Sequence, residues 1–416
     1  MVNLLSLVSK FLIDGSYVGN MISRDVLVDV IEYWEEEISR AKVIQRDILD
    51  DIKKTMNMEE ITVITGIRRS GKTYILYGLF KQHGGLYINF EDERLIDFST
   101  EDFERIVSIA EERGTNILYF DEVQEVKGWE KFAHRAHRRF KIFVTGSNSK
   151  LLSSDYAQLL TGRTKTFVIT PLTYKEFLRF RNLRANRKSL LEYMQTGGFP
   201  RIVLTGDLSL AREYFERIIY RDIIPRSDIR YPESLKDIAL YLLSNVGKEF
   251  SYRSLSRITG IKHEVTLRNY VSLLRNAFLI NIIPRYSPSI KKQESYGKKV
   301  YAMDPSFITL GKRISEDHGR ILENIVFNHL SKRYKEIYYL KNEREADFII
   351  CESLKPRKVV NVVFDVKSDE TLKREIASLR YYGKKYQVET ELISLFPVSV
   401  PPEIKHRLAH HYLKEF

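Results

Sequence analysis

The sequence predicts an α/β protein in which a parallel sheet carries helices on both faces, followed by helical regions and a smaller α/β region. Two observations support this fold class. Apolar runs typical of strands alternate with helical runs from residue 61 to residue 170. From residue 317 the pattern changes to a helix, several short strands, a second helix and a last strand. At 416 residues and 49.0 kDa, the chain is long enough for about two to four domains.

The expected elements follow one another without an internal repeat or a low-complexity tract. Residues 22–56 are expected to be helical. The alternating segment then gives strands at 61–66, 86–91, 116–122, 141–147 and 166–170, separated by helices at 72–82, 101–113 and 128–139. Residues 171–245 are mostly helical, and residues 246–300 form a compact basic helical module.

Composition excludes several classes of protein. No stretch approaches the roughly 18 consecutive apolar residues that span a bilayer, and the opening MVNLLSLVSKFLIDG lacks the basic start and cleavage site of a signal peptide. The single cysteine, Cys351, excludes internal disulfides and multi-cysteine metal sites. We therefore expect a cytoplasmic protein with no membrane partner.

The positive charge is concentrated in one region. The whole chain carries a net charge of +12, and ten Lys or Arg residues against two Glu give residues 251–300 a surplus of ten minus two, or +8. A local basic surplus favours a polyanionic partner.

A glycine-rich motif, GIRRSGKT at 66–73, follows the first apolar strand and opens a helix. It fits the pattern G-x-x-x-x-G-K-[ST], in which backbone amides wrap a phosphate, the lysine reaches the β and γ oxygens, and the hydroxyl holds Mg²⁺. The motif predicts binding of ATP with Mg²⁺. The expected contacts are Gly66, Ile67, Arg68, Arg69, Ser70, Gly71, Lys72, Thr73 and Tyr74.

Two acidic residues end the strand ILYFDE about fifty residues further on. A carboxylate at Asp121 can reach Mg²⁺ through water, and its neighbour Glu122 can polarise the attacking water. The competing interpretation is a glycine turn and an unrelated, solvated acidic pair.

Two further residues have a functional and a plain interpretation. Asn148, after the strand KIFVTGS, either orients the attacking water or caps a loop. Arg163, in LTGRT, lies where ring-forming ATPases carry an arginine finger that reaches a neighbour's nucleotide, which predicts a homo-oligomer. A single arginine beside a strand is otherwise a solvated charge.

The motifs GIRRSGKT, YFDEVQEVKGWEKF, FVTGSNSKLLSS, LTGR, PLTYKEFL and GGFPR occur in this order and closely resemble archaeal and bacterial AAA-type ATPases with a DUF4143 C-terminal region. Weaker similarity, in YRDIIPR, VYAMDPSF and ENIVFNHL, extends to about residue 385. The resemblance implies an AAA+ core with a helical lid, a winged helix-turn-helix and a PD-(D/E)XK nuclease-like domain. The corresponding boundaries are 1–40 (N-terminal helical segment), 41–170, 171–245, 246–305 and 306–416.

The basic module is expected to be a helix-turn-helix with a turn at Gly260. Its second helix buries Leu267, Val271, Leu274 and Phe278, and leaves His263, Thr266, Arg268, Asn269 and Ser272 outward. YSPSIKKQESYGKKV is the expected wing hairpin, and Arg268, Lys291 and Lys292 are the expected contacts to duplex DNA. The alternative is a module that only packs against the ATPase as a spacer.

The last region contains acidic residues in the order of restriction-type nucleases. Glu323 lies on an expected helix, Asp347 on a strand, and Asp365 and Lys367 on the apolar strand VVNVVFDVK, where residues two apart share a face. The three carboxylates are expected to bind Mg²⁺ or Mn²⁺, with Lys367 positioning or deprotonating water. The alternatives are an edge strand with ordinary alternating charges or a nuclease-like domain that has lost activity.

These observations predict an ATPase that acts on or with DNA and couples its nucleotide state to a winged helix and a nuclease-like domain. The alternative is a nucleotide-dependent switch whose C-terminal domains only bind DNA or a protein partner.

Overall fold

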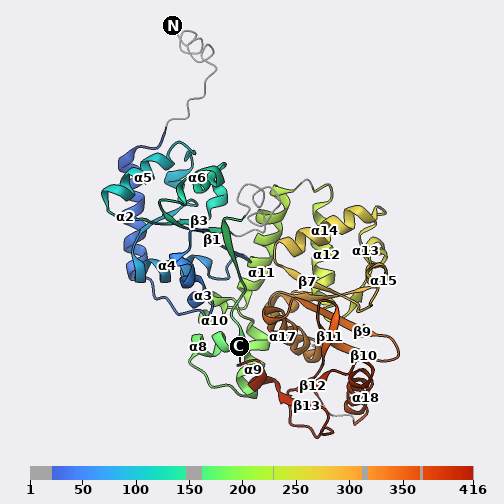
Figure 1. Ribbon diagram of the computed structural model, residues 1–416. Coiled ribbons are helices and arrows are strands. Elements are labelled where there is room, and N and C mark those ends of the chain that lie inside the picture. The colour runs from blue at the N-terminus through green and yellow to red at the C-terminus, as the bar shows by residue number, and fades with distance from the viewer. Residues whose placement is uncertain (1–20, 147–161, 228, 312–316, 366–368, 416) are drawn as a thin grey trace. The chain divides into compact units, whose positions relative to one another are not determined.

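The computed structural model describes residues 21–146, 162–227, 229–311, 317–365 and 369–415 (Figure 1). The chain divides into two compact units. The described part of the first is residues 21–64, 73–146 and 162–167, and that of the second is residues 65–72 and 168–415. Among the described residues, none of the helices combines the length and apolar composition needed to cross a bilayer.

The first unit begins with α2 (Arg24–Arg40), which Ser23 caps through a hydrogen bond to the amide of Val26. The predicted helix over 22–56 is broken, because the chain turns to extended backbone at Ala41 before the short α3 (Leu49–Lys53). The longer helices that follow among the described residues are α4 (Lys72–His83), α5 (Phe103–Glu112) and α6 (Trp129–Ala136). Amphipathic spacing explains α5, in which Phe103, Ile106, Ile109 and Ala110 form the buried face.

A five-stranded sheet has the order β2-β3-β4-β1-β5. Its strands are β1 (Ile61–Gly66), β2 (Leu86–Asn89), β3 (Ile117–Asp121), β4 (Lys141–Gly146) and β5 (Thr164–Ile169). β3 pairs with both β2 and β4 in parallel. Every residue of β1 is buried, as expected for an apolar strand covered on both faces. The alternation of strands and helices predicted from the sequence is confirmed, with boundaries shifted by a few residues at most.

The second unit continues with helices, as predicted for residues 171–245. They are α8 (Tyr174–Arg181), α9 (Arg187–Thr196), α10 (Pro200–Thr205), α11 (Ser209–Arg217) and α12 (Pro232–Ser244). Between α11 and α12 the chain forms one π-helical turn, η5 (Ile218–Ile223), and a short 3₁₀ turn, η6 (Ile224–Arg226). Single π-helical turns occur frequently at functional sites.

The basic module contains β6 (Glu249–Phe250), α13 (Tyr252–Thr259), α14 (Glu264–Asn276), β7 (Ile280–Pro284), α15 (Ile290–Ser295) and β8 (Lys298–Ala302). The strands form an antiparallel sheet of order β6-β8-β7. The expected wing hairpin over 286–300 is wrong, because α15 occupies its centre and buries Gln293, whose amide donates to the carbonyl of Ser287.

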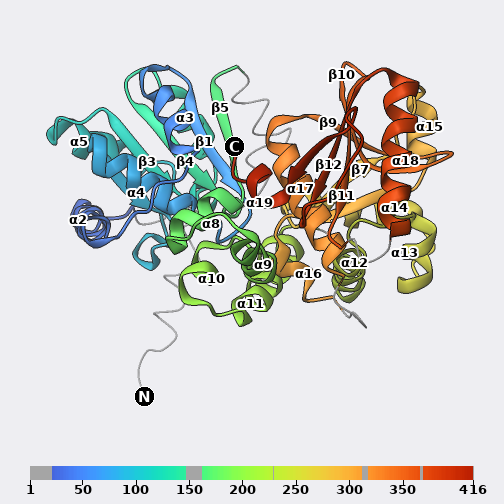
Figure 2. The same cartoon turned by 90° about the horizontal axis from the view of Figure 1, so that it is seen from below.

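The C-terminal module contains α17 (His318–Arg333), β9 (Glu336–Lys341), β10 (Glu345–Glu352), β11 (Lys355–Val363), α18 (Asp369–Tyr386), β12 (Glu389–Ser394) and β13 (Lys405–Leu408), with short helices α16 (Pro305–Ile308) and α19 (Ala409–Tyr412) at its ends. The sheet order is β13-β12-β11-β10-β9. Figure 2 shows α17 and α18 on opposite sides of this sheet. Alternation along β10 explains the two layers: Phe348 and Ile350 belong to the core that includes α17, whereas Ile349 and Cys351 pack in the cluster that includes α18.

Candidate active site

The phosphate loop lies between β1 and α4, as the sequence predicts. Gly66 has a φ of +140°, and a Cβ on it would lie 2.1 Å from the carbonyl oxygen of Ile169, so this position requires glycine. The ammonium of Lys72 donates to the carbonyls of Gly66 and Ile67 at 3.2 Å each. A loop lysine that bonds its own loop carbonyls is held close to where phosphate oxygens bind in this motif.

Two of the four residues between the loop glycines, Ile67 and Arg68, have buried side chains that contact other parts of the second unit. Ile67 is fully buried and belongs to the same apolar core as Phe199 and Ile219. Arg68 forms an ion pair with Asp222 of η5, with 3.6 Å between Nε and Oδ2, and the two side chains are only 8% and 3% exposed. Arg69 has a left-handed φ of 67°. Sequence reasoning named Arg68 as a nucleotide contact but missed Asp222, for which the motif YRDIIPR was the only signal.

The two predicted acidic residues lie at the end of β3. Asp121 is buried and accepts hydrogen bonds from the hydroxyls of Tyr87 (2.7 Å) and Thr145. Thr73, the residue after Lys72, also hydrogen-bonds to Asp121. Burial and the charge of Glu122 raise the pKa of Asp121, and these three hydroxyl hydrogen bonds oppose that shift. A hydroxyl and a hydrogen-bonded carboxylate are suitable partners for hydrated Mg²⁺, so these residues fit the predicted ion.

Glu122 has the strained backbone typical of a functional position. Its φ of 51° and ψ of 45° lie in the left-handed region, which costs a residue other than glycine about 1–3 kcal/mol. Its backbone amide donates to Thr145 Oγ1 at 3.0 Å, and the Gln124 amide donates to its carboxylate at 2.6 Å. The predicted pair Asp121 and Glu122 is therefore not a solvated loop feature. Thr145 and Gln124 are supporting residues that the sequence analysis missed.

Arg163 precedes β5 at the opposite end of β1 from the phosphate loop. Its carbonyl accepts from the amide of Ile61, the first residue of β1, at 2.8 Å, and its guanidinium hydrogen-bonds to the ring of His134. The six residues of β1 separate Ile61 from Gly66 by roughly 17 Å at 3.3 Å per residue. Arg163 is thus remote from the phosphate loop of its own chain. Asn148 lies outside the described residues.

The basic module presents the polar side of α14, as predicted. Leu267, Val271 and Leu274 are buried, and the expected outward residues are exposed apart from the half-buried Thr266. Phe278, which was expected on this helix, follows its end at Asn276 and is partly buried. An open groove of about 400 Å³ is lined by Ser227, Arg230, Thr266, Asn269, Tyr270, Ser272 and Leu273.

The three side chains of this module that are expected to contact DNA differ in whether other residues already bind them. Arg268 already donates to Glu264 (2.9 and 2.6 Å) and stacks over the ring of Tyr252 at 4.5 Å. Lys291 and Lys292 are exposed on α15. Arg230, which lines the groove of α14, was missed because it lies outside the basic stretch.

The carboxylates of the C-terminal module do not form the predicted metal site. β11 ends at Val363, so Asp365 is not on the strand, and Lys367 lies outside the described residues. Glu323 and Asp347 instead make ion pairs with the buried Lys299 of β8. Although burial disfavours its charged form, the three nearby carboxylates hold the pKa of Lys299 above its ordinary value. Among the residues that the structure describes, no group of three or more His, Cys, Asp and Glu side chains is arranged to hold a metal ion.

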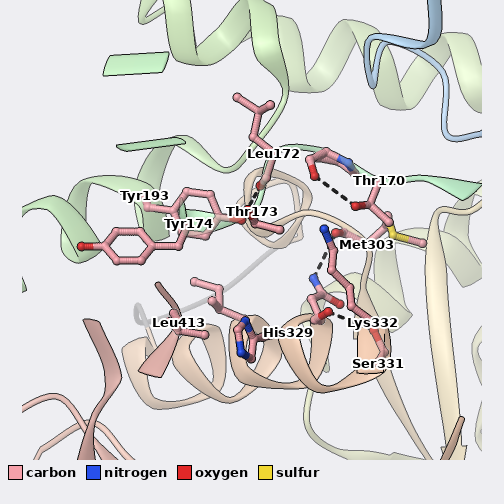
Figure 3. Close-up of a pocket in the computed structure, with 13 residues that line it drawn as sticks. Thr170, Leu172, Thr173, Tyr174, Tyr193, Met303, His329, Ser331, Lys332 and Leu413 are labelled. Atoms are coloured by element: carbon pink, nitrogen blue, oxygen red, sulfur yellow. Dashed lines mark hydrogen bonds between the residues drawn. The ribbon is translucent and has the colours of Figure 1, made fainter. Parts of the chain in front are cut away.

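A small cavity of about 40 Å³ adjoins the start of α8 and the helix α17 (Figure 3). Tyr193 and His329 line it, and burial lowers the pKa of His329 to about 4. A space of this size holds only a few water molecules. The cavity is therefore too small for a nucleotide.

Comparisons with known proteins support an AAA-type ATPase domain. The sequence profile of the AAA domain matches residues 58–178, and that of DUF8612, a domain of unknown function, matches residues 187–317. The DUF4143 region implied by the resemblance is not shown. The uncharacterized protein MJ1544 of Methanocaldococcus jannaschii is 35% identical over 390 residues, which cover 86% of each chain.

Two further proteins are similar to the chain. An uncharacterized protein of Haemophilus influenzae is 31% identical over 341 residues, covering 75% of this chain and 84% of its own. Among solved structures, a Walker-type ATPase of Pyrococcus abyssi matches with a TM-score of 0.45 and 17% identity, over 65% of this chain and 95% of its own.

Proposed function

Because the chain belongs to the same family as MJ1544 of Methanocaldococcus jannaschii and carries an AAA ATPase domain, we propose that it hydrolyses ATP with Mg²⁺ and couples this cycle to nucleic-acid binding by its basic module. The main support for ATP hydrolysis is the arrangement of the acidic side chains at the end of β3. Asp121 is held by three hydroxyls, and Glu122 is held in a strained conformation next to it.

Each residue has a distinct task in hydrolysis. The loop amides and Lys72 bind the phosphates, and Thr73 and Asp121 hold the hydrated Mg²⁺. When bound, the ion neutralises phosphate charge. Glu122 polarises the attacking water, and Gln124 and Thr145 fix the orientation of Glu122 through the two hydrogen bonds to it.

Replacement of Glu122 tests this assignment. Glu122→Gln keeps the shape of the side chain and removes its basicity, so ATP binding should persist while turnover falls by about 100-fold or more. Lys72→Ala should lose binding itself. Glu125→Gln, an exposed glutamate three residues away, is the matched control and should turn over ATP normally. Wild-type turnover by Glu122→Gln would refute the role of this residue as the base.

The nucleic-acid half of the proposal is supported by the surface of the basic module. The groove beside α14 combines the guanidinium of Arg230 with hydroxyl and amide side chains, which are the groups that commonly bind phosphate oxygens. Lys291 and Lys292 are exposed on α15. The antiparallel sheet and the helix pair α13–α14 have the connectivity expected of a winged helix, with a short helix in place of the wing.

Salt dependence tests this surface. Replacing Arg230, Lys291 and Lys292 by Ala should weaken binding of duplex DNA and flatten the slope of log K against log salt by up to about 2.7, because each lost phosphate contact removes about 0.9. Replacing Lys373, Lys384 and Lys405, which are exposed on the C-terminal module, removes the same charge elsewhere and should leave the slope unchanged. Equal effects of the two triple variants would place the DNA site outside the basic module.

Cleavage of DNA is not part of the proposed function. The ammonium of Lys299 pairs with both predicted metal ligands, Glu323 and Asp347, and Asp365 follows the end of β11. This arrangement favours the alternative in which the C-terminal module only binds DNA or a protein partner.

A further inference from the structure

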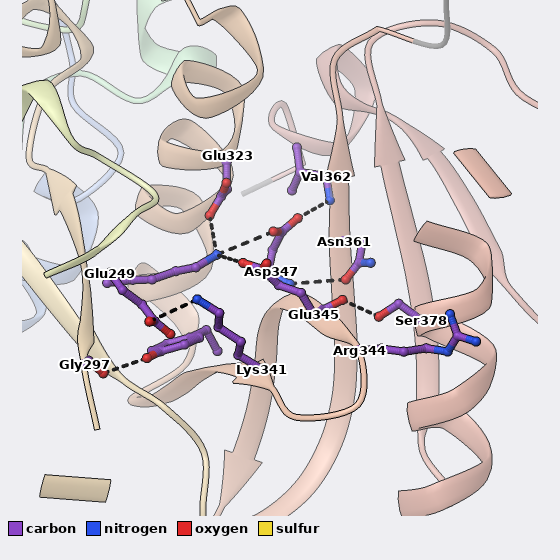
Figure 4. Close-up of polar contacts among 12 residues, drawn as sticks. Glu249, Gly297, Glu323, Lys341, Arg344, Glu345, Asp347, Asn361, Val362 and Ser378 are labelled. Atoms are coloured by element: carbon purple, nitrogen blue, oxygen red, sulfur yellow. Dashed lines mark hydrogen bonds and ion pairs between the residues drawn. The ribbon is translucent and has the colours of Figure 1, made fainter. Parts of the chain in front are cut away.

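The buried lysine of β8 lies among carboxylates from two other elements. Lys299 Nζ is 3.3 Å from Glu323 Oε1 of α17, 3.3 Å from Glu345 Oε1 and 3.7 Å from Asp347 Oδ1, both of β10. Figure 4 shows Glu323 and Asp347 directed toward the same point, with Glu345 beside them. The cluster therefore gathers three carboxyl groups around one ammonium group.

The groups around the lysine are buried and hydrogen-bonded. The side chain of Lys299 is 3% exposed, and those of Glu323 and Asp347 are 12% and 17% exposed. The hydroxyl of Tyr301, two residues along β8, donates to Glu323 at 2.7 Å, and the amide of Val362 donates to Asp347 at 2.8 Å. Burying an ammonium group is costly unless charges and hydrogen bonds compensate it, and this cluster supplies both.

We propose that the ammonium of Lys299 is the resident cation of this carboxylate cluster, in the position that a divalent ion would need, so that the C-terminal module binds no metal ion there. The distances fit an ammonium, whereas Mg²⁺ requires oxygens at about 2.0–2.1 Å. An ion entering the cluster would first have to expel a side chain that is covalently tethered and buried. This inference is independent of ATP hydrolysis.

The same lysine connects two modules of the chain. β8 belongs to the three-stranded sheet of the basic module, whereas α17 and β10 belong to the C-terminal module. A second connection lies nearby, where the amide of Tyr286 donates to the carbonyl of Tyr339 at 2.8 Å. With Lys299 as its cation, the cluster fastens the basic module to the C-terminal module, which then acts as a non-cleaving platform beside the proposed DNA site.

The experiment counts Mn²⁺ ions bound to the full-length protein without nucleotide, by electron paramagnetic resonance of free Mn²⁺. Wild type and Asp347→Asn should bind the same number, because any ion at the nucleotide site counts equally in both. Lys299→Ala should bind one ion more than wild type, since it leaves the carboxylates with space for a hydrated ion. Lys299→Met keeps the volume filled and should gain none, and adding Asp347→Asn to Lys299→Ala should remove the gained ion.

Two results would overturn the proposal. If wild type bound one Mn²⁺ more than Asp347→Asn, the cluster would be a metal site in the native protein. If folded Lys299→Ala gained no ion, the ammonium would not be taking a cation's position. The first comparison leaves Lys299 intact, so it decides the matter even if Lys299→Ala does not fold.

Discussion

The ion pair between the phosphate loop and η5 gives a quantitative prediction for Asp222→Asn. Arg68 and Asp222 are almost completely buried, and removing one partner of a buried pair costs about 3–5 kcal/mol, because the remaining charge loses its compensation. Since Arg68 belongs to the loop, part of this cost should appear as displacement of the loop. We expect a lower free energy of unfolding and, in the folded protein, at least about tenfold weaker binding of ATP, equivalent to about 1.4 kcal/mol.

Two measurements on the same samples separate these effects. Urea unfolding without nucleotide reports the loss of stability, and titration with a fluorescent ATP analogue reports the affinity. In a double-mutant cycle, Arg68→Gln and Asp222→Asn should be non-additive by about 0.5–3 kcal/mol, the range for side chains in contact. Asp237→Asn, an exposed aspartate on α12, is the matched control and should change stability by less than about 0.5 kcal/mol. If Asp222→Asn behaved like this control, the pair would not hold the loop.

Three further predictions follow from single positions. Gly66→Ala should abolish the rise in melting temperature caused by ATP, because its methyl group would overlap the Ile169 carbonyl; a normal rise would contradict the observed close approach. Arg163→Ala mixed with Lys72→Ala should regain part of the ATPase activity if Arg163 acts on a neighbouring chain, whereas a fully active monomer in sedimentation would exclude that role. Burial raises the pKa of Asp304 from 3.8 to about 6, so the folded state holds this proton more tightly than the unfolded state. The free energy of unfolding should therefore fall as pH rises from about 4 to about 6. Urea unfolding of Asp304→Asn should show a shallower fall over this range.

The fold could be predicted wherever the spacing of apolar residues determines whether a segment forms a strand or a helix. Largely buried strands such as β1 and β3 are short, mostly apolar runs, and the helices between them follow the spacing of their apolar residues. The phosphate loop, Asp121 and Glu122 were predictable because local motifs specify them. The alternation in VVNVVFDVK also predicted a strand through Lys367, but β11 stops at Val363, where its pairing with Ser394 of β12 ends. The length of a strand depends on its partner strands, which a local pattern does not reveal.

Lys299 was missed for a related reason. The sequence analysis recognised that clustered carboxylates need a cation and assigned a metal ion to that role. The signal for a different answer was present in KKVYA, where Lys299 and Tyr301 share one face of a strand whose last four residues are buried. A charged residue on a buried strand requires a counter-charge, but its partners lie 24 to 48 residues further along the chain, and only the tertiary fold identifies them.

The phosphate loop shows how a local motif acquires a long-range role. The pattern constrains the glycines, the lysine and the hydroxyl, and leaves four positions between the glycines open. This chain uses two of them outside phosphate binding: Ile67 packs in the core of the second unit, and Arg68 pairs with Asp222. Cores are close-packed, and buried charges tolerate little separation. A shift of the loop on nucleotide binding would therefore displace η5, and the proposed coupling of ATP hydrolysis to the basic module would use this connection.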